Sequence, residues 1–187
     1  MVRSGLPITM LVAAMLAASP LYAAEVAGVR IEERTKADLV LNGAGLRSRL
    51  FFKVYVAALY TTKKTTSAAE LIDSREPRRI AMHMLRELDA DALIGALKDG
   101  LRQNHGESEL AVLKTDIDQL ENIMRSIGSA RPGDVIAIDF STDGTAISFN
   151  GQPRGNIAGT AFGRALLKVW LGEKPVDTGL KQALLGG

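Results

Sequence analysis

The chain has 187 residues, with 23 Lys and Arg against 21 Asp and Glu, and it contains no cysteine. A hydrophobic fraction of 47% with 24% charged residues is ordinary for one folded domain and excludes a disordered chain. The net charge of +2 comes without a dense Lys or Arg stripe and gives no indication of a nucleic-acid partner. The lack of cysteine excludes disulfides, thiol catalysis and thiolate metal sites.

The N-terminal segment has the pattern of a secretory signal peptide. Arg3 supplies a positive charge, residues 6–18 form an uncharged and mostly apolar run, and Ala23 is the small residue expected at a cleavage site. A membrane-spanning helix needs about 20 apolar residues, and this run is shorter and interrupted by prolines. We therefore expect cleavage of residues 1–23, a single mature domain over 24–187 without a membrane span, and a bacterial periplasmic location.

The first part of the mature chain favours strands, because its apolar residues follow a period of two. Residues 29–32 alternate, residues 39–41 are apolar, and the Asn-Gly-Ala-Gly segment at 42–45 predicts a turn. Residues 46–60 predict one long strand, with an apolar even-numbered face on the core and a mixed odd-numbered face. Two further elements are expected here, a short helix at 67–73 and a strand at 78–87.

The middle of the chain is predicted to be helical, and strands return after it. Asp89 is a suitable N-cap for a helix reaching about Gln103, and apolar residues that step by three and four over 110–127 predict one amphipathic helix. Strands are expected at 134–141, 146–149 and 152–156, and helices at 158–171 and 177–185. This succession predicts an α+β fold with an antiparallel β-sheet.

Patterns typical of metal, nucleotide or nucleophile sites are missing from the sequence. His83 and His105 are far apart and lack metal-ligand spacing. Gly43-Ala44-Gly45 has no third glycine and precedes a strand instead of a helix, and no Gly-x-Ser-x-Gly motif occurs. We therefore expect no metal and no cofactor.

Four residues would share the odd-numbered face of the long strand: Arg47, Phe51, Tyr55 and Leu59. A guanidinium binds a carboxylate or enolate oxygen through two hydrogen bonds, and a tyrosine hydroxyl adds another donor. Phe51 and Leu59 would supply apolar walls. Spacing alone leaves a second interpretation open and favours it, namely the solvent-exposed face of an antiparallel strand.

Two longer segments resemble a known family. Residues 39–47 (LVLNGAGLR) followed by 51–60 (FFKVYVAALY) resemble the N-terminal hallmark of the chalcone isomerase fold family. Residues 157–185, with WLGEKPVD at 170–177, are similar to the C-terminal signature of its bacterial chalcone isomerase-like branch. The resemblance covers essentially the whole mature chain. It implies an open-faced sandwich, an antiparallel sheet faced by a layer of helices, with a ligand cleft between them.

The resemblance also implies roles for single residues. Arg47 matches the arginine with which the plant enzymes hold and polarise their substrate, and Tyr55 stands where they have a threonine that helps to order a water. A further catalytic tyrosine of the plant enzymes has no counterpart within residues 88–93. Non-catalytic branches of the family bind fatty acids through the corresponding arginine, so the resemblance favours binding over catalysis.

The sequence therefore predicts a periplasmic chalcone isomerase-like protein that binds a fatty acid or a similar apolar carboxylate. Arg47 would hold the anion, Tyr55 would be a second donor, and Phe51 and Leu59 would line the cleft, with no catalytic residue. Two alternatives remain open. One is an isomerase of the intramolecular lyase type acting on a chalcone-like substrate, and the other is a helper protein that binds a partner without any small ligand.

Overall fold

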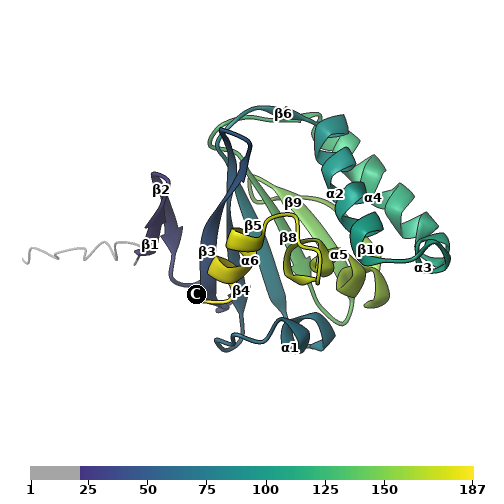
Figure 1. Cartoon of the computed structure of the whole chain (residues 1–187), viewed down its shortest axis with the longest axis horizontal. Coiled ribbons are helices and arrows are strands. Elements are labelled where there is room, and N and C mark those ends of the chain that lie inside the picture. Colours follow the sequence, from purple (N-terminus) through teal and green to yellow (C-terminus); the bar gives the residue numbers. More distant parts are fainter. Residues whose placement is uncertain (1–21) are drawn as a thin grey trace, which may run out of the picture.

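The computed structural model describes residues 22–187, so most of the predicted signal peptide lies outside the described part. The centre of the fold is a six-stranded antiparallel sheet with the strand order β10-β9-β8-β5-β4-β3. Its strands are β3 (Val40–Arg49), β4 (Phe52–Thr61), β5 (Arg78–Met84), β8 (Val135–Phe140), β9 (Gly144–Phe149) and β10 (Gln152–Ala158). The helices pack against one face of this sheet, while a separate hairpin lies toward the other (Figure 1).

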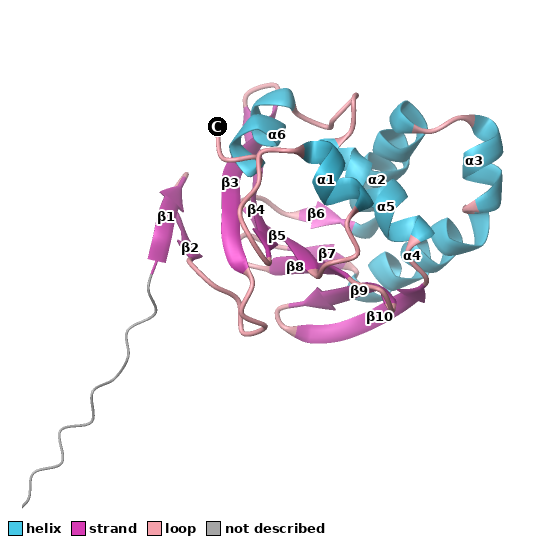
Figure 2. Cartoon of the chain, turned by 90° about the horizontal axis from the view of Figure 1, so that it is seen from below, coloured by secondary structure: helices cyan, strands magenta, loops and turns pink. Residues whose placement is uncertain are grey.

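The helical layer follows the predicted order, with one difference. Its members are α1 (Ala68–Asp73), α2 (Ala90–Asn104), α3 (Glu107–Val112), α4 (Lys114–Ile127), α5 (Ala161–Leu171) and α6 (Thr178–Leu184). Asp89 caps α2 as predicted, because its carboxylate accepts a hydrogen bond from the Ala92 N–H at 2.7 Å. The helix predicted over 110–127 is two helices, since the chain bends at Leu113. Figure 2 shows the helices gathered on one side of the strands.

The remaining strands form two short pairs, β1 (Tyr22–Val26) with β2 (Val29–Glu32) and β6 (Leu88–Asp89) with β7 (Ser129–Ala130). The β1–β2 hairpin buries Ile31 completely in an apolar cluster with Leu41 and Val56. This cluster lies on the face of the sheet opposite to the helices. Within residues 22–187, no helix is long and apolar enough to span a membrane.

The segment predicted as one strand over 46–60 is a β-hairpin. The chain reverses at Leu50 and Phe51, where Leu50 adopts a φ of 55°. No Gly, Asn or Pro marks this turn, and so the pattern predicted a continuous strand. Arg47 and Tyr55 are cross-strand partners in β3 and β4. They share a face because of this pairing and not because of their spacing along one strand.

Both faces of β4 are buried, which corrects the prediction of one core-facing side. Tyr55 and Leu59 belong to the large core beneath the helices. Val56 and Ala58 belong to the cluster beneath the β1–β2 hairpin. The odd-numbered face, predicted to be the mixed one, is therefore the face that the helices cover.

The Asn-Gly-Ala-Gly segment predicted as a turn lies inside β3. Its glycines allow α6 to approach: a Cβ atom on Gly43 would lie 2.1 Å from the Ala183 carbonyl oxygen, and one on Gly45 would lie 2.6 Å from the Ala183 Cβ atom. The Asn42 side chain donates a hydrogen bond to the Leu184 carbonyl at 2.7 Å. The segment thus joins the C-terminal helix to the sheet. The predicted α+β class, an antiparallel sheet faced by helices, is confirmed.

Candidate functional site

An apolar cavity of about 30 Å³ lies between the sheet and the helices. Its lining comes from four strands of the central sheet, from three helices, and from β6 and the α5–α6 loop. The lining residues are Arg47, Tyr55, Met82, Leu88, Leu93, Ala96, Leu97, Met124, Ile136, Val169, Trp170 and Val176. The structure therefore brings two of the predicted site residues, Arg47 and Tyr55, to one cavity.

The guanidinium group of Arg47 places a positive charge beside this apolar cavity. Its guanidinium carbon lies 5.6 Å from the centre of the Tyr55 ring, within the range of a cation–π contact. Its Nε atom is buried and has no hydrogen-bond partner within residues 22–187. Buried donors are nearly always paired in folded proteins, and a donor on a charged group is especially costly to leave unpaired. The arrangement suits an anionic acceptor that enters from outside.

Tyr55 is fixed by a hydrogen bond from the far end of the chain. The indole Nε1 of Trp170 donates to the Tyr55 hydroxyl oxygen at 3.0 Å, and both side chains are buried. Burial raises the pKa of Tyr55, against the positive charge of Arg47 and the bond from Trp170, which lower it. The hydroxyl therefore keeps its proton at neutral pH. Because Trp170 occupies the oxygen as a donor, that proton is available to an acceptor in the cavity.

The two predicted wall residues do not line the cavity. Phe51 is 98% exposed, because it lies in the β3–β4 turn. Leu59 is completely buried on the same face as Tyr55, but it lies farther along β4, in the core beneath the helices. The apolar walls come instead from α2, α4 and α5. Ligand binding by Arg47 and Tyr55 stays a prediction.

Trp170 is a residue of the site for which the sequence contains a recognisable signal. It is the only tryptophan of the chain, and it lies in the helix predicted over 158–171. A buried indole N–H needs an acceptor, and this requirement already indicates a polar partner in the core. Which partner it finds depends on the packing of α5 on β4, and the sequence alone does not show that.

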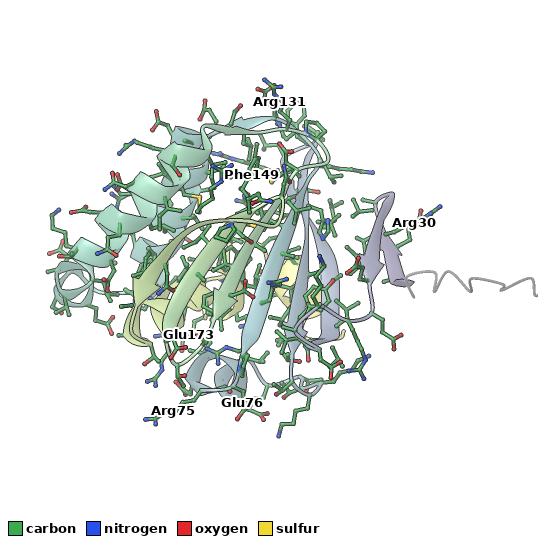
Figure 3. All side chains as sticks on the ribbon, turned by 180° about the vertical axis from the view of Figure 1, so that it is seen from behind. Arg30, Arg75, Glu76, Arg131, Phe149 and Glu173 are labelled. Atoms are coloured by element: carbon green, nitrogen blue, oxygen red, sulfur yellow. The ribbon has the colours of Figure 1, made fainter. Side chains whose placement is uncertain are left out.

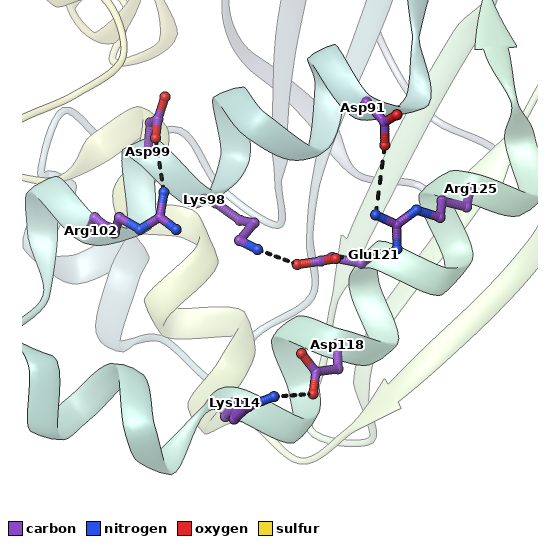
Figure 4. Close-up of polar contacts among 8 residues, drawn as sticks. All are labelled: Asp91, Lys98, Asp99, Arg102, Lys114, Asp118, Glu121 and Arg125. Atoms are coloured by element: carbon purple, nitrogen blue, oxygen red, sulfur yellow. Dashed lines mark hydrogen bonds and ion pairs between the residues drawn. The ribbon is translucent and has the colours of Figure 1, made fainter.

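Polar side chains link helices α2 and α4, which both contribute residues to the cavity (Figure 4). Lys98 Nζ contacts Glu121 Oε1 at 2.5 Å, and Arg125 lies 3.7 Å from Asp91. The hydrogen bond from Lys98 holds the pKa of Glu121 below its usual value. These contacts join the two helices into one unit.

The opposite face of the sheet carries a wider groove of about 1080 Å³ between the β1–β2 hairpin and strands β8 to β10. Two of its polar residues, Arg79 and Tyr60, have partners within the protein. Arg79 Nε and Nη2 donate to the two carboxylate oxygens of Asp139 at 2.7 and 2.8 Å. The Tyr60 hydroxyl donates to the Glu32 carbonyl at 3.2 Å, and burial raises the pKa of Tyr60 to about 12.

The other buried polar atoms without a partner among the described residues lie on β5, β9 and α5. They belong to Arg78, Thr145 and Arg164. Arg78 is already held through Nη1, which donates to the carbonyls of Ser74 and Glu76 at 2.6 and 2.8 Å. None of these three residues lines the apolar cavity. No group of three or more His, Cys, Asp or Glu side chains in the described part of the chain is arranged to hold a metal ion.

The relationship of the chain to known proteins follows from its sequence and its fold. A family model described as chalcone isomerase-like matches residues 23–186. A crystal structure of a fatty-acid binding protein from Arabidopsis thaliana is similar with a TM-score of 0.69 and 14% identity, over 84% of this chain and 92% of that chain. At this identity, the similarity shows the fold. No curated protein sequence matches the chain. Because the family model spans nearly all described residues, the chain belongs to the chalcone isomerase-like family.

Proposed function

We propose that the protein binds a fatty acid or a similar apolar carboxylate between the sheet and the helices. The observation that carries this proposal is the buried Arg47 Nε, which has no partner in the described part of the chain and borders an otherwise apolar cavity. A guanidinium pairs with a carboxylate through two parallel hydrogen bonds. Arg47 would hold the carboxylate, and the Tyr55 hydroxyl would be the second donor.

The composition of the cavity favours a binding protein over a ring-closing enzyme. Leu88 and Leu93 both line it, in the stretch where the resemblance to the plant enzymes would place a catalytic tyrosine. Ring closure of a chalcone develops charge on an enolate oxygen and requires donors aimed at that oxygen. One arginine and one tyrosine provide part of this, while the apolar lining suits an acyl chain. We expect chalcone cyclisation to stay near the uncatalysed rate.

The size of the cavity sets a condition on the proposal. Its volume of about 30 Å³ is close to the share of one water molecule, whereas pockets for small ligands measure roughly 300–1,000 Å³. An acyl chain therefore enters only when the helices move away from the sheet. Met82 and Met124 line the cavity, and their flexible side chains can repack around such a ligand.

The direction of this movement follows from the packing of α2. A Cβ atom on Gly100 would lie 2.7 Å from a methyl carbon of Val169, so the C-terminal half of α2 is tightly packed on α5. The N-terminal half carries Leu93 and Ala96, which border the cavity. Opening is thus expected at the N-terminal half, with α4 following through the contact of Arg125 with Asp91 in the first turn of α2.

The single tryptophan provides a direct test of acid binding. Trp170 borders the cavity, so its fluorescence should change saturably when dodecanoic acid is added. The matched control ligand is 1-dodecanol, which has the same chain without the charge. A charge-assisted hydrogen bond contributes about 1.5–3 kcal/mol, so the alcohol should bind roughly ten- to a hundredfold more weakly. No saturable response, or equal affinities for acid and alcohol, would contradict the proposal.

The similar Arabidopsis thaliana structure is that of a fatty-acid binding protein, and this supports the choice of ligand class. Native mass spectrometry of protein purified from its own source provides an independent check. A co-purifying carboxylic acid would support the proposal. A stable complex with another protein and no small ligand would favour the helper role instead.

The location is a separate part of the proposal. We propose export to a bacterial periplasm, on the basis of the charged and apolar pattern of the leader. The mature protein should then begin near Ala24. Intact-mass measurement on protein from the periplasmic fraction tests this, and retention of Met1 would contradict it.

A further inference from the structure

The β3–β4 turn presents three consecutive large apolar residues to solvent. Leu50, Phe51 and Phe52 are 85%, 98% and 57% exposed. Within residues 22–187, Val112 is the only other large apolar residue with comparable exposure. We call these three residues and the turn that carries them the apolar tip. A contiguous apolar cluster on an otherwise polar surface typically marks an interaction site.

Basic side chains surround the apolar tip. Arg49 and Lys53 flank it on β3 and β4, and both are exposed. Arg86, from the segment between β5 and β6, lies over the Phe52 ring with its guanidinium carbon 4.9 Å from the ring centre. None of these three cations forms an ion pair with any described residue.

Acidic side chains do not neutralise this group. Strands β3 and β4 and their turn contain no Asp or Glu. The nearest acid along the chain from Arg86 is Glu87, and it lies 3.8 Å from Arg131, which compensates its charge. The tip therefore combines exposed leucine and phenylalanine with a net positive charge.

We propose that the apolar tip docks on an anionic lipid surface. The apolar side chains would enter the interface, while Arg49, Lys53 and Arg86 would contact acidic headgroups. Apolar and basic residues side by side are the combination that binds anionic membranes, and each Lys or Arg near such a surface contributes about 1 kcal/mol. The charge also argues against a second copy of the chain as the occupant, because two identical basic tips would repel each other.

The position of the tip gives this docking a consequence. Arg47 and Tyr55 lie on the same two strands a short distance before and after the turn, and the turn lies at the end of the sheet where β6 is found (Figure 1). β6 contributes Leu88 to the cavity. A docked tip would therefore hold the cavity close to the lipid, and this consequence, unlike the docking itself, rests on the proposed function.

Vesicle sedimentation tests the docking. The protein, with its N-terminus established by intact mass and identical in all variants, is mixed with phosphatidylcholine vesicles with or without phosphatidylglycerol. We expect binding to the anionic vesicles only. Phe51→Ser should weaken it at least about tenfold, since burial of a Phe side chain is worth about 1.5–3 kcal/mol. Arg49→Glu and Lys53→Glu should each weaken it at least about fivefold.

Matched variants elsewhere on the surface are the controls. Val112→Ser removes the other exposed apolar residue, and Lys36→Glu reverses an exposed charge on the loop after β2. Both should bind anionic vesicles like the unmodified protein. Equal losses in these controls, equal binding to neutral vesicles, or no vesicle binding at all would overturn the proposal. So would self-association that Phe51→Ser abolishes in the absence of vesicle binding.

The lipid docking and the proposed binding of an acid can be refuted independently of each other. Phe51→Ser should keep the Trp170 response to dodecanoic acid, because Phe51 does not line the cavity. A protein that responds to the acid but ignores anionic vesicles would refute the docking alone. A protein that binds the vesicles but shows no response to the acid would refute the proposed function alone.

Discussion

The two faces of the sheet each carry an arginine, and the two arginines have opposite surroundings. On the open face, Arg79 makes two hydrogen bonds to Asp139, and these raise its pKa further above its usual value. On the helix-covered face, Arg47 contacts the Tyr55 ring and leaves a buried N–H without a partner among the described residues. The open face is wide and its Arg79 is paired with a carboxylate, whereas the cavity on the covered face is small, apolar and bordered by a guanidinium with an unpaired N–H. The comparison shows that pairing and burial, and not residue type, distinguish a candidate anion site from a structural ion pair.

Figure 3 views the molecule from behind, with Arg30 on the β1–β2 hairpin at one side and Arg131, in the segment between β7 and β8, at the top. Because the two faces differ in burial, substitutions on them should differ in how far they lower the free energy of unfolding. The covered face carries the core, so its variants should lose folding stability. The solvated pairs of the open face lie outside the apolar cluster beneath the β1–β2 hairpin, so variants of these pairs should lose little stability.

The largest effect is expected for Trp170→Ala. Trp170 is 1% exposed and belongs to the core beneath the helices. Removing a buried Trp side chain should lower the free energy of unfolding by about 3–5 kcal/mol. Urea denaturation measures this, with Asn156→Ala in the exposed groove as the control, which should stay within about 0.5 kcal/mol. A small effect of Trp170→Ala would show that α5 is not firmly packed on the sheet.

A pair of tyrosine substitutions compares the faces with the same chemistry. Tyr55→Phe leaves the buried Trp170 N–H without its acceptor and should cost about 1–3 kcal/mol. Tyr60→Phe leaves only the carbonyl of the exposed residue Glu32 without its donor, and water can replace that donor. The free energy of unfolding should therefore fall by about 1 kcal/mol or less. Equal losses in urea denaturation would contradict the difference between the faces.

Breaking the open-face ion pair should have a smaller effect. Arg79 and Asp139 have side chains that are 30% and 34% exposed, so solvent screens their attraction. Arg79→Met should lower the free energy of unfolding by about 1 kcal/mol or less, and added salt should reduce the difference. Its affinity for dodecanoic acid should not change. A weakened affinity would indicate that the acid binds on the open face, which would contradict the proposed site at Arg47.

The smallest expected effect is a pH dependence from His83 on the open face. Burial lowers the pKa of His83, against the weaker opposing effect of Glu32. The unfolded chain therefore binds the proton more readily, so the contribution to stability is complete above about pH 6.5 and is lost as the pH falls through the lower pKa of the folded state. His83→Asn should flatten the change in urea midpoint between about pH 6.5 and pH 5, above the range of the carboxylates. An unchanged slope would contradict this assignment.

Local rules in the sequence were enough for most of the elements. Asp89 caps a helix at the position predicted, and Asp177 caps the helix expected over 177–185, since each carboxylate accepts a hydrogen bond from an N–H three residues later. The strands from 134 onward and the helices that follow them were found from alternation and hairpin signals. The order of these elements, together with the family resemblance, predicted the α+β sheet and helix layers.

Long-range packing explains what the sequence did not show. Leu50 adopts a turn conformation without a turn residue, so the hairpin was read as one strand and Phe51 was placed in the cleft. The glycines of β3 resemble a turn signal in the sequence. They are in fact required by the close approach of α6, which lies at the other end of the chain. The pattern predicted that Arg47 and Tyr55 lie on one face. It did not predict the hydrogen bond between Tyr55 in β4 and Trp170 in α5, because these residues are far apart along the chain.

The central claim is that the Arg47 guanidinium binds the carboxylate of the ligand, and isothermal titration with dodecanoic acid tests it most directly. Arg47→Ala should bind roughly ten- to a hundredfold more weakly, from the loss of a charge-assisted pair worth about 1.5–3 kcal/mol. Arg47→Lys should recover only part, because an ammonium cannot form the two parallel bonds. Arg49→Ala, an exposed arginine on the same strand, should bind the soluble acid like the unmodified protein. Equal affinities for the unmodified protein and Arg47→Ala would contradict the claim.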